Sequence, residues 1–364
     1  MTHNKTALLI AYNRKQDIDE AIALANTAGY EITHLIKQTY LKRPKFGISE
    51  KIVEKLVDLA TEFDPDVIIY DEVLRPSQNY NLASKIHRNV LDCEALILEI
   101  FENNASSSES KLQVKLAKMR YELLRAKEKV RLARAGEQPG FLGIGQFEVD
   151  VYYNDIKHRM HGVKAKLKKS EKQRALHRQA RQRVDFRTVS LAGYTSAGKT
   201  TLFNKMTGED AAESKELFTT LSTTVRRVED KNKKNVFLLS DTVGFISKLP
   251  EYMIEAFRST LEEMIDTDLV MLVIDSNDQF STMKKKLSSC RNTLNNLGVD
   301  EKKIILIFNK LDLTDDDIIR EKIEDLKLEK EQKWMAISSK TGANIPKLLE
   351  VVNGILKYSQ GVSV

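Results

Sequence analysis

Hydrophobic residues in the first hundred positions fall into short apolar runs separated by segments of helical spacing. The runs at 5–12, 32–38 and 66–70 predict strands, and the amphipathic segments at 17–27 and 49–63 predict helices. Ser49 stands where a helix cap is expected. Alternating strands and helices indicate a small α/β domain, which we place at residues 1–105. We find no catalytic group of residues within it.

Two later segments carry apolar residues at intervals of four and three, which predicts long paired helices. The first has Leu112, Leu116, Met119, Leu123, Ala126 and Val130, and the second has Ile156, Met160, Val163 and Leu167. We expect an antiparallel helical hairpin, coiled-coil-like, over residues 106–184. Its glycine-rich tip, about residues 135–148, contains Phe141 and Phe147. Two interpretations stay open: a loop folded onto the hairpin, or a probe whose aromatic rings stack on unpaired bases.

The strongest chemical signal is the sequence GYTSAGKT at residues 193–200. An apolar strand precedes it and a helix follows it, so that several backbone N–H groups converge on one point suited to phosphates. We expect Lys199 to reach the terminal phosphates and the Thr200 hydroxyl to ligate Mg²⁺. The predicted phosphate-binding residues are Gly193, Tyr194, Thr195, Ser196, Ala197, Gly198, Lys199, Thr200 and Thr201.

Asp241-Thr242-Val243-Gly244 follows a second apolar strand. Asp241 can hold Mg²⁺ through water, and the Gly244 backbone N–H can approach a γ-phosphate. The next residue is Phe245, where small GTPases usually carry a glutamine that orients water. Because phenylalanine cannot orient water, we expect slow intrinsic hydrolysis that a partner or another residue must complete.

The first switch must supply a threonine to Mg²⁺ from the segment between Thr207 and Val225. The candidates are Thr219, Thr220, Thr223 and Thr224, of which we select Thr220. The expected catalytic residues are therefore Lys199, Gly244 and Thr220, and the expected metal ligands are Thr200, Thr220 and Asp241.

Asn309-Lys310-Leu311-Asp312 follows a buried-type strand and predicts guanine recognition. The Asp312 carboxylate can accept from two guanine N–H groups that adenine lacks, which discriminates by roughly 10⁴ or more. Asn309 would tie this loop to the phosphate loop, and the Lys310 stem would pack on the base. Ser338, Ser339 and Lys340 come after the next strand and would close over the guanine O6. The order of motifs predicts a GTP-binding domain with a mostly parallel sheet and flanking helices at residues 185–364.

The chain of 364 residues is longer than one such domain needs, in agreement with two further parts before it. Its 41% hydrophobic content supports folded cores, and it has no apolar run of transmembrane length. Cys93 and Cys290 have no metal-binding spacing and fit a reducing compartment. We expect a cytoplasmic protein without a membrane span. We also expect a monomer, because the two helices of the hairpin can bury each other's apolar residues.

The net charge of +6 is modest, but its distribution is uneven. Between residues 157 and 187 basic side chains greatly outnumber acidic ones, which favours binding to nucleic-acid phosphates over a merely solvated helix face. The RNA-binding candidates are Lys164, Lys166, Lys168, Lys169, Lys172 and Arg174, together with Phe141 and Phe147 at the tip.

These features together resemble the HflX family of ribosome-associated GTPases. The resemblance rests on GYTSAGKTTLFN at 193–204, LFTTL at 217–221 and DTVGFISKLP at 241–250. Upstream, LRPSQ at 74–78 and KLQVKLA at 111–117 are similar to that family's N-terminal region. The resemblance implies an N-terminal α/β domain, a helical hairpin and a C-terminal GTPase domain. It also implies binding to the large ribosomal subunit and a role in ribosome splitting or rescue.

Two other functions compete with a ribosome-stimulated GTPase switch. A signalling GTPase would use the hairpin to bind a protein effector without RNA. A self-sufficient GTP hydrolase would need no partner, although Phe245 argues against it.

Overall fold

The computed structural model describes residues 5–135, 144–183, 186–209, 218, 224–229, 236–242, 244–246, 250–256, 261, 264–328 and 332–358. The chain divides into two compact units. Unit 1 comprises residues 1–170 and 250–256, and unit 2 comprises residues 171–249 and 257–364. This division does not test our expected domain boundaries at residues 105 and 185, which stay predictions.

Unit 1 is built on a four-stranded parallel sheet in the order β2-β1-β3-β4. Its strands are β1 (Lys5–Tyr12), β2 (Tyr30–Gln38), β3 (Val67–Tyr70) and β4 (Asn89–Asp92). The helices that alternate with them are α1 (Lys15–Thr27), α2 (Glu50–Phe63), α3 (Pro76–Ile86) and α4 (Cys93–Asn104). The expected α/β alternation is confirmed, and the sequence patterns had not identified α3, β4 and α4.

The helices of unit 1 pack in pairs, with α2 against α3 and α1 against α4. Leu8, Ile10, Ile68 and Val90 from the strands share one hydrophobic core with Leu56 of α2. Burying this apolar surface is the main source of stability for such a sheet, at about 25 cal/mol for each Å² removed from water. The carboxyl ends of all four strands lie at one edge because the strands are parallel.

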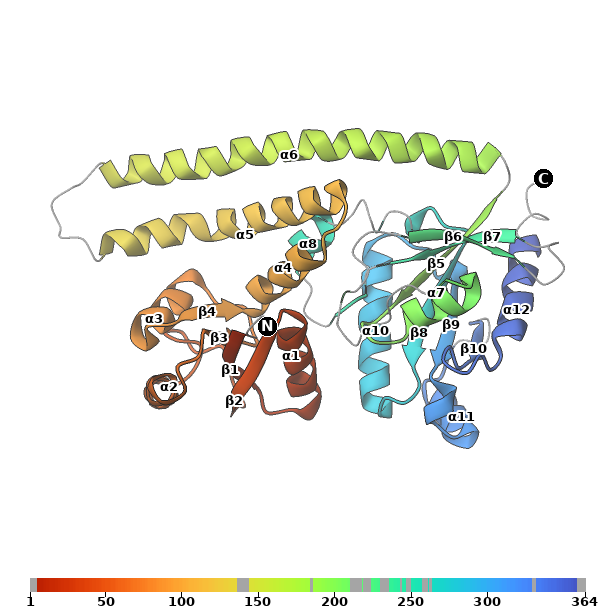
Figure 1. Cartoon of the computed structure of the whole chain (residues 1–364), viewed down its shortest axis with the longest axis horizontal. Coiled ribbons are helices and arrows are strands. Elements are labelled where there is room, and N and C mark those ends of the chain that lie inside the picture. The colour runs from red at the N-terminus through yellow and green to blue at the C-terminus, as the bar shows by residue number, and fades with distance from the viewer. Residues whose placement is uncertain are drawn as a thin grey trace. The chain divides into compact units, whose positions relative to one another are not determined.

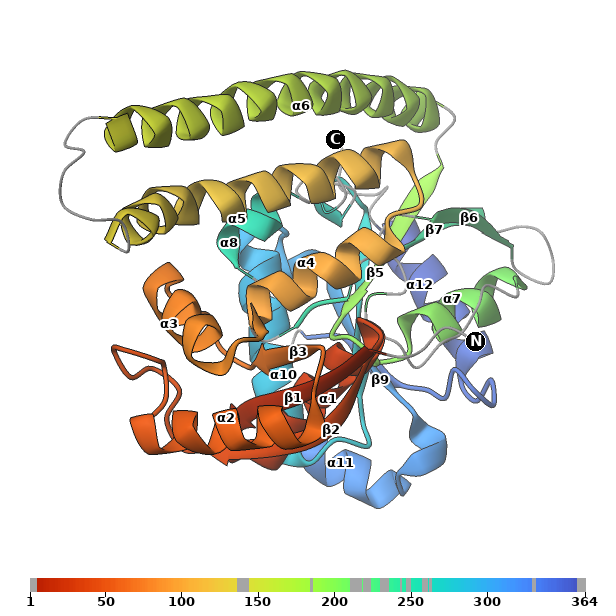
Figure 2. The same cartoon turned by 60° about the vertical axis from the view of Figure 1, so that its left-hand side comes forward.

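The helical hairpin consists of α5 (Ser108–Ala135) and α6 (Ile144–Arg183), which run side by side (Figures 1 and 2). The seam predicted from four-and-three spacing is confirmed. The buried residues that form it are Leu116, Met119, Ala126, Ile156, Met160, Val163 and Leu167, with Leu112 and Leu123 packed beside them. Val130 is described by its backbone alone, and most of the tip lies outside the described residues.

Unit 2 contains a six-stranded sheet in the order β10-β9-β8-β5-β7-β6. The strands are β5 (Arg187–Gly193), β6 (Thr224–Glu229), β7 (Val236–Asp241), β8 (Leu269–Asp275), β9 (Ile304–Asn309) and β10 (Trp334–Ala336). Only the β6–β7 pair is antiparallel among the described strands. The predicted, mostly parallel sheet is confirmed. At its centre β8 and β9 are apolar up to their last residue because both of their faces are covered.

Helices α7 (Lys199–Thr207) and α12 (Ile345–Tyr358) share a core with the strands of unit 2. Leu202 and Phe203 of α7 and Leu348 and Val352 of α12 are buried in it. Helix α10 (Phe280–Asn296) packs on β5 and β8, while α11 (Asp316–Asp325) follows the guanine motif. Two short 3₁₀ turns, η1 (Glu301–Lys303) and η2 (Leu311–Leu313), flank β9.

We expected residues 252–264 to form a helix that covers the unit 2 sheet. The structure corrects this for the first part of the segment, since α8 (Glu251–Ala256) belongs to unit 1 and packs on α5. The Tyr252 hydroxyl donates to Glu94 at 3.2 Å, and Arg120 donates to the Tyr252 carbonyl at 3.0 Å. The apolar residues Met253 and Ala256 of α8 are buried in this position.

Among the described residues, no helix combines the length and the apolar character that crossing a membrane requires.

Candidate functional site: a guanine-nucleotide pocket

The phosphate loop lies between β5 and α7, as the GYTSAGKT sequence predicted. Gly193 and Gly198 both adopt positive φ, at 146° and 90°. A Cβ at Gly193 would collide with the carbonyl oxygen of Val273, and one at Gly198 would collide with the Asn309 amide. Only glycine therefore allows the loop to curl tightly between β8 and the Asn309 loop.

Lys199 points from the first turn of α7 into this loop, and 7% of the residue is exposed. Its ammonium donates to the Tyr194 carbonyl at 2.9 Å. Burial lowers the pKa of Lys199, while the nearby Asp241 carboxylate acts in the opposite direction. An anion placed in the loop would compensate this buried positive charge, which is the electrostatic role expected for a phosphate.

Thr200 and Asp241 converge at the carboxyl end of β7. The Thr200 Oγ1 donates to the Asp241 Oδ2 at 3.1 Å. A hydroxyl and a carboxylate this close are hard oxygen donors of the kind that Mg²⁺ takes, either directly or through water. The residues present therefore fit the metal that GTP carries.

Asn309 connects three loops of unit 2 through its side-chain amide. The Nδ2 group donates to the Ala197 carbonyl of the phosphate loop at 2.9 Å. The Oδ1 atom accepts from the Ser339 backbone N–H at 2.9 Å and from the Ser339 hydroxyl at 2.8 Å. The expected bridge from Asn309 to the phosphate loop is thus present in the structure.

The guanine-reading segment is ordered by side chains on either side of it. Ser338 donates its hydroxyl to the Asp312 carboxylate at 2.6 Å, which fixes the orientation of the second oxygen. Lys310, with φ of 69°, extends its ammonium to Asp275 at 2.5 Å. This ion pair fixes the lysine stem, which we expect to pack on the base. Lys340, in the loop that follows β10, is exposed.

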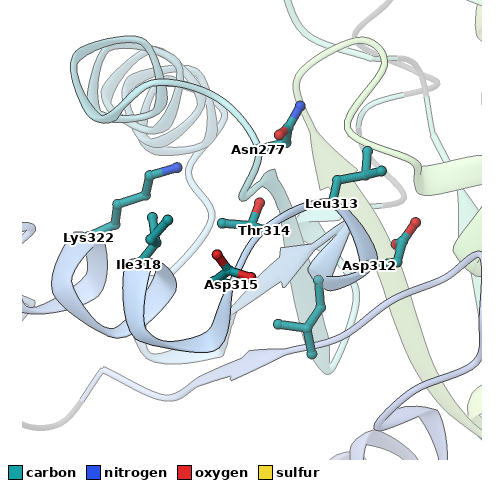
Figure 3. A pocket seen from close by; sticks show the side chains of 8 residues that line it. Asn277, Asp312, Leu313, Thr314, Asp315, Ile318 and Lys322 are labelled. Carbon is teal, nitrogen blue, oxygen red and sulfur yellow. The ribbon is translucent and has the colours of Figure 1, made fainter.

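A hollow of about 510 Å³ opens beside Asp312 (Figure 3). Asn277, Asp312 and Leu313 lie toward one side of it, and Ile318 and Lys322 of α11 lie toward the other. Lys322 donates to the carbonyls of Ser276 and Asp278, both at 2.8 Å, which fastens α11 to the end of β8.

Phe245 pairs with the phosphate loop through its backbone. Its N–H donates to the Gly193 carbonyl at 3.0 Å, and its carbonyl accepts from the Thr195 N–H at 2.8 Å. The phenyl ring is buried, with 2% of the residue exposed. Gly244 is consequently pressed against the loop, so that a Cβ there would lie 2.8 Å from the Thr195 methyl and 3.0 Å from the Lys199 ammonium.

The remaining predicted site residues are not all placed. Thr220 and Phe141 lie outside the described residues, and only the backbones of Phe147 and Arg174 are described, both in α6. The five predicted lysines of α6 are exposed: Lys164, Lys166, Lys168, Lys169 and Lys172. They occupy the side of the helix away from the buried seam residues Val163 and Leu167.

Three family models match most of the chain between residues 15 and 310. A model described as "GTP-binding GTPase N-terminal" matches residues 15–102, and one described as "GTP-binding GTPase Middle Region" matches residues 104–181. A third, described as "50S ribosome-binding GTPase", matches residues 188–310.

Curated relatives agree with these matches. GTPase HflX of Methanocaldococcus jannaschii is 41% identical over 86% of this chain and 76% of its own length. This chain belongs to the HflX family of GTPases. GTPase HflX of Escherichia coli is 32% identical over 93% of this chain and 78% of its own length. The resemblance stated from the sequence is therefore confirmed, and with it the activity of a GTPase that binds GTP.

A solved structure shares the fold of this HflX protein. The GTP-binding protein from Sulfolobus solfataricus, in complex with GDP, is 26% identical and superposes with a TM-score of 0.52. The match covers 97% of this chain and 99% of that protein.

Three features of the site escaped sequence reasoning. They are the Ser338–Asp312 hydrogen bond, the Lys310–Asp275 ion pair and the backbone pairing of Phe245 with the phosphate loop. Ser339 was expected at the guanine O6, and the structure shows its hydroxyl as a second donor to Asn309.

We predict that Asp312→Asn lowers the affinity for GTP at least about 100-fold, because an amide cannot accept from both guanine N–H groups. Xanthosine triphosphate, which offers an acceptor where guanine has an amine, should bind the variant better than GTP. Titration with fluorescent analogues of GTP and of xanthosine triphosphate measures the two affinities. Asp315→Asn, an exposed neighbour of the same chemistry, is the control and should retain GTP binding.

We predict that Gly244→Ala lowers kcat for GTP hydrolysis by roughly 100-fold, since the methyl group would enter the space between Thr195 and Lys199. GDP affinity should change less than about threefold, because the crowding lies where a third phosphate would arrive. Gly354→Ala, in α12 with no atom within 4 Å of the added Cβ, is the matched control. Equal loss of GDP and GTP binding would contradict this assignment.

Proposed function

We propose that this HflX protein is an Mg²⁺-dependent GTPase that binds the large ribosomal subunit and acts as a nucleotide-controlled switch in ribosome splitting, rescue or assembly. The observation that carries the proposal is the set of five exposed lysines on the outer side of α6. No ion pair joins them to another side chain that the structure describes. Lysines along one helix that have no carboxylate partner can bind the phosphates of RNA.

The family comparison supports the same partner, because the model that matches residues 188–310 is described as a ribosome-binding GTPase. We place the protein in the cytoplasm, where ribosomes are, and propose that it works as a monomer. Over the part of the hairpin that the structure describes, its apolar seam is buried within one chain, which supports a monomer.

In the proposed catalytic state, Thr200 and Thr220 would hold Mg²⁺, and Asp241 would hold it through water. Bound Mg²⁺ would neutralise charge on the β- and γ-phosphates. Lys199 donates to the terminal phosphates, and the backbone N–H groups of the phosphate loop surround the β-phosphate. Asn309, Lys310, Asp312, Ser338, Ser339 and Lys340 hold the guanine. The Gly244 N–H contacts the γ-phosphate, so this contact forms with GTP and is absent with GDP.

Hydrolysis is proposed to be slow in the isolated protein because of Phe245. Its ring is buried and its backbone is bonded to the phosphate loop, so this residue offers no group that orients water. A donor or acceptor from the ribosome, or a rearrangement that the ribosome favours, would complete the site. Hydrolysis would then release the Gly244 contact and lower affinity for the subunit.

A second candidate function is a signalling GTPase whose hairpin binds a protein effector. The exposed apolar residues Val151 and Tyr152 near the start of α6 favour it. The two functions differ in salt dependence, because apolar docking on a protein depends on salt far less than binding to RNA.

We predict that reversing Lys166, Lys168, Lys169 and Lys172 to glutamate lowers affinity for large ribosomal subunits by at least about tenfold at physiological salt, since several phosphate contacts are lost. Co-sedimentation with purified subunits, in the presence of a non-hydrolysable GTP analogue or of GDP, measures the affinity. The wild-type protein should pellet better with the GTP analogue.

The matched control reverses Lys284, Lys302, Lys333 and Lys347, which are exposed on unit 2 and give the same change of net charge. Equal pelleting of the α6 variant and the control would contradict the role of α6. Pelleting of a protein partner that is insensitive to salt, without pelleting of subunits, would favour the effector function.

A further inference from the structure

Tyr194, the second residue of the phosphate loop, is held through both its backbone and its ring. Its carbonyl accepts from the Lys199 ammonium at 2.9 Å and from the Ala197 N–H at 3.3 Å. Its ring lies against helix α10, where the Lys286 ammonium stands 5.1 Å from the ring centroid. The residue is buried. The backbone of Tyr194 therefore serves the phosphate site, while its side chain is held by a helix outside that site.

Lys286 is itself fixed by a carboxylate in the loop that follows β8. Its ammonium donates to the Asp278 Oδ2 at 2.8 Å, and both side chains are partly buried. Asp278 cannot easily move, because Lys322 donates to its carbonyl and to that of Ser276. A cation over an aromatic face is attracted to the ring electrons, and more strongly where water is partly excluded. The chain Asp278–Lys286–Tyr194 thus connects a fixed loop to the phosphate loop.

The space behind the phosphate loop is closely filled. The cavity between the loop, β8 and α10 measures about 10 Å³, at the lower limit for a single water molecule. Cys290 of α10 lines it and is buried, with 2% of the residue exposed. Burial raises the pKa of the Cys290 thiol to about 12, although Lys199 and Lys286 lie close enough to oppose the rise. The Tyr194 ring therefore cannot leave its place without parting the loop from α10.

We propose that Lys286 is a positioning residue for GTP binding, which acts through Tyr194 on Lys199. With the ring held beneath Lys286, the Tyr194 carbonyl keeps one orientation, and this acceptor holds the Lys199 ammonium where the terminal phosphates arrive. Without Lys286, Lys199 has more conformations to lose when a nucleotide binds. The inference concerns the GTPase site itself and goes beyond the proposed ribosomal function, on which it does not depend.

The test compares the full chain with Lys286→Met, which keeps the length of the side chain and removes its charge. The GDP dissociation rate and the KM for GTP should each rise roughly fivefold, the size expected for one partly buried cation over a ring. The kcat at saturating GTP should change less than about twofold, because bound phosphates then hold Lys199 in place. A purely structural role would instead lower kcat through loss of folded protein and leave KM unchanged.

Three further variants separate the ring from the charge. Lys286→Arg keeps a cation that can reach both the ring and Asp278, and should stay within about twofold of the wild type. Lys284→Met removes the same charge from an exposed position on α10 and should change neither constant. Tyr194→Leu removes the ring, so adding Lys286→Met to it should have little further effect.

Cys290 provides a direct measure of the contact between the loop and α10. The chain has two cysteines, so a Cys93→Ser background leaves Cys290 as its single thiol. A thiol reagent reaches it only when the loop parts from α10, an opening that labelling rates report. In the nucleotide-free protein, Lys286→Met should speed labelling roughly fivefold. GDP should slow labelling of both proteins.

Wild-type KM and GDP dissociation in Lys286→Met overturn the inference, and so does a fall in kcat at unchanged KM. Full additivity of Tyr194→Leu and Lys286→Met would mean that the lysine charge attracts phosphates directly, which overturns the route through Tyr194. Unchanged labelling of Cys290 contradicts the same route, and this measurement needs no change at Tyr194. All of these readouts use the protein without ribosomes, so a failure of the proposed ribosomal function is separate from a failure here.

Discussion

The nucleotide site of this HflX protein depends on the side chain of Asn309. Its amide bonds simultaneously to Ala197 in the phosphate loop and to Ser339 in the loop that follows β10. The residue itself ends β9, so a central strand fixes its position. Buried and fully paired, this amide stabilises the site, whereas an unpaired amide in the same place would cost about 1–3 kcal/mol. The phosphate half and the guanine half are therefore held as one surface.

Attached to this fixed surface is the segment that we propose to change with the nucleotide. Phe245 occupies backbone partners in the phosphate loop, and Gly244 lies against Thr195 and Lys199 with no room for a methyl group. A γ-phosphate that arrives beside Lys199 has to share this space. Residues 250–256, which follow closely in the chain, belong to unit 1, where Tyr252 bonds to Glu94. Gly244 thus lies seven positions before the first residue of α8, a helix that belongs to unit 1.

Much of the fold and most of the nucleotide site could be predicted from the sequence, because their signals are local. GYTSAGKT contains its own glycines, lysine and threonine, and the hairpin seam repeats at a fixed interval along each helix. The strands β8 and β9 are apolar up to their last residue because they are covered on both faces.

The contacts that could not be predicted join residues that are distant in sequence. Arg125 of α5 forms a buried ion pair with Asp92 at the end of β4, 33 positions away, and Tyr252 reaches Glu94 over 158 positions. Gln78 reaches Arg43 over 35 positions. No periodicity marks such pairs, since each is decided by how the strands and helices pack. The assignment of α8 to unit 1 could not be predicted for the same reason.

The most direct test of the central claim is the rate of GTP turnover by the purified protein as large ribosomal subunits are added. The account predicts slow turnover alone and a large, saturable stimulation by the subunits, because the partner completes a site in which Phe245 cannot orient water. Fast turnover without subunits, or no stimulation while nucleotide binding is intact, would contradict it.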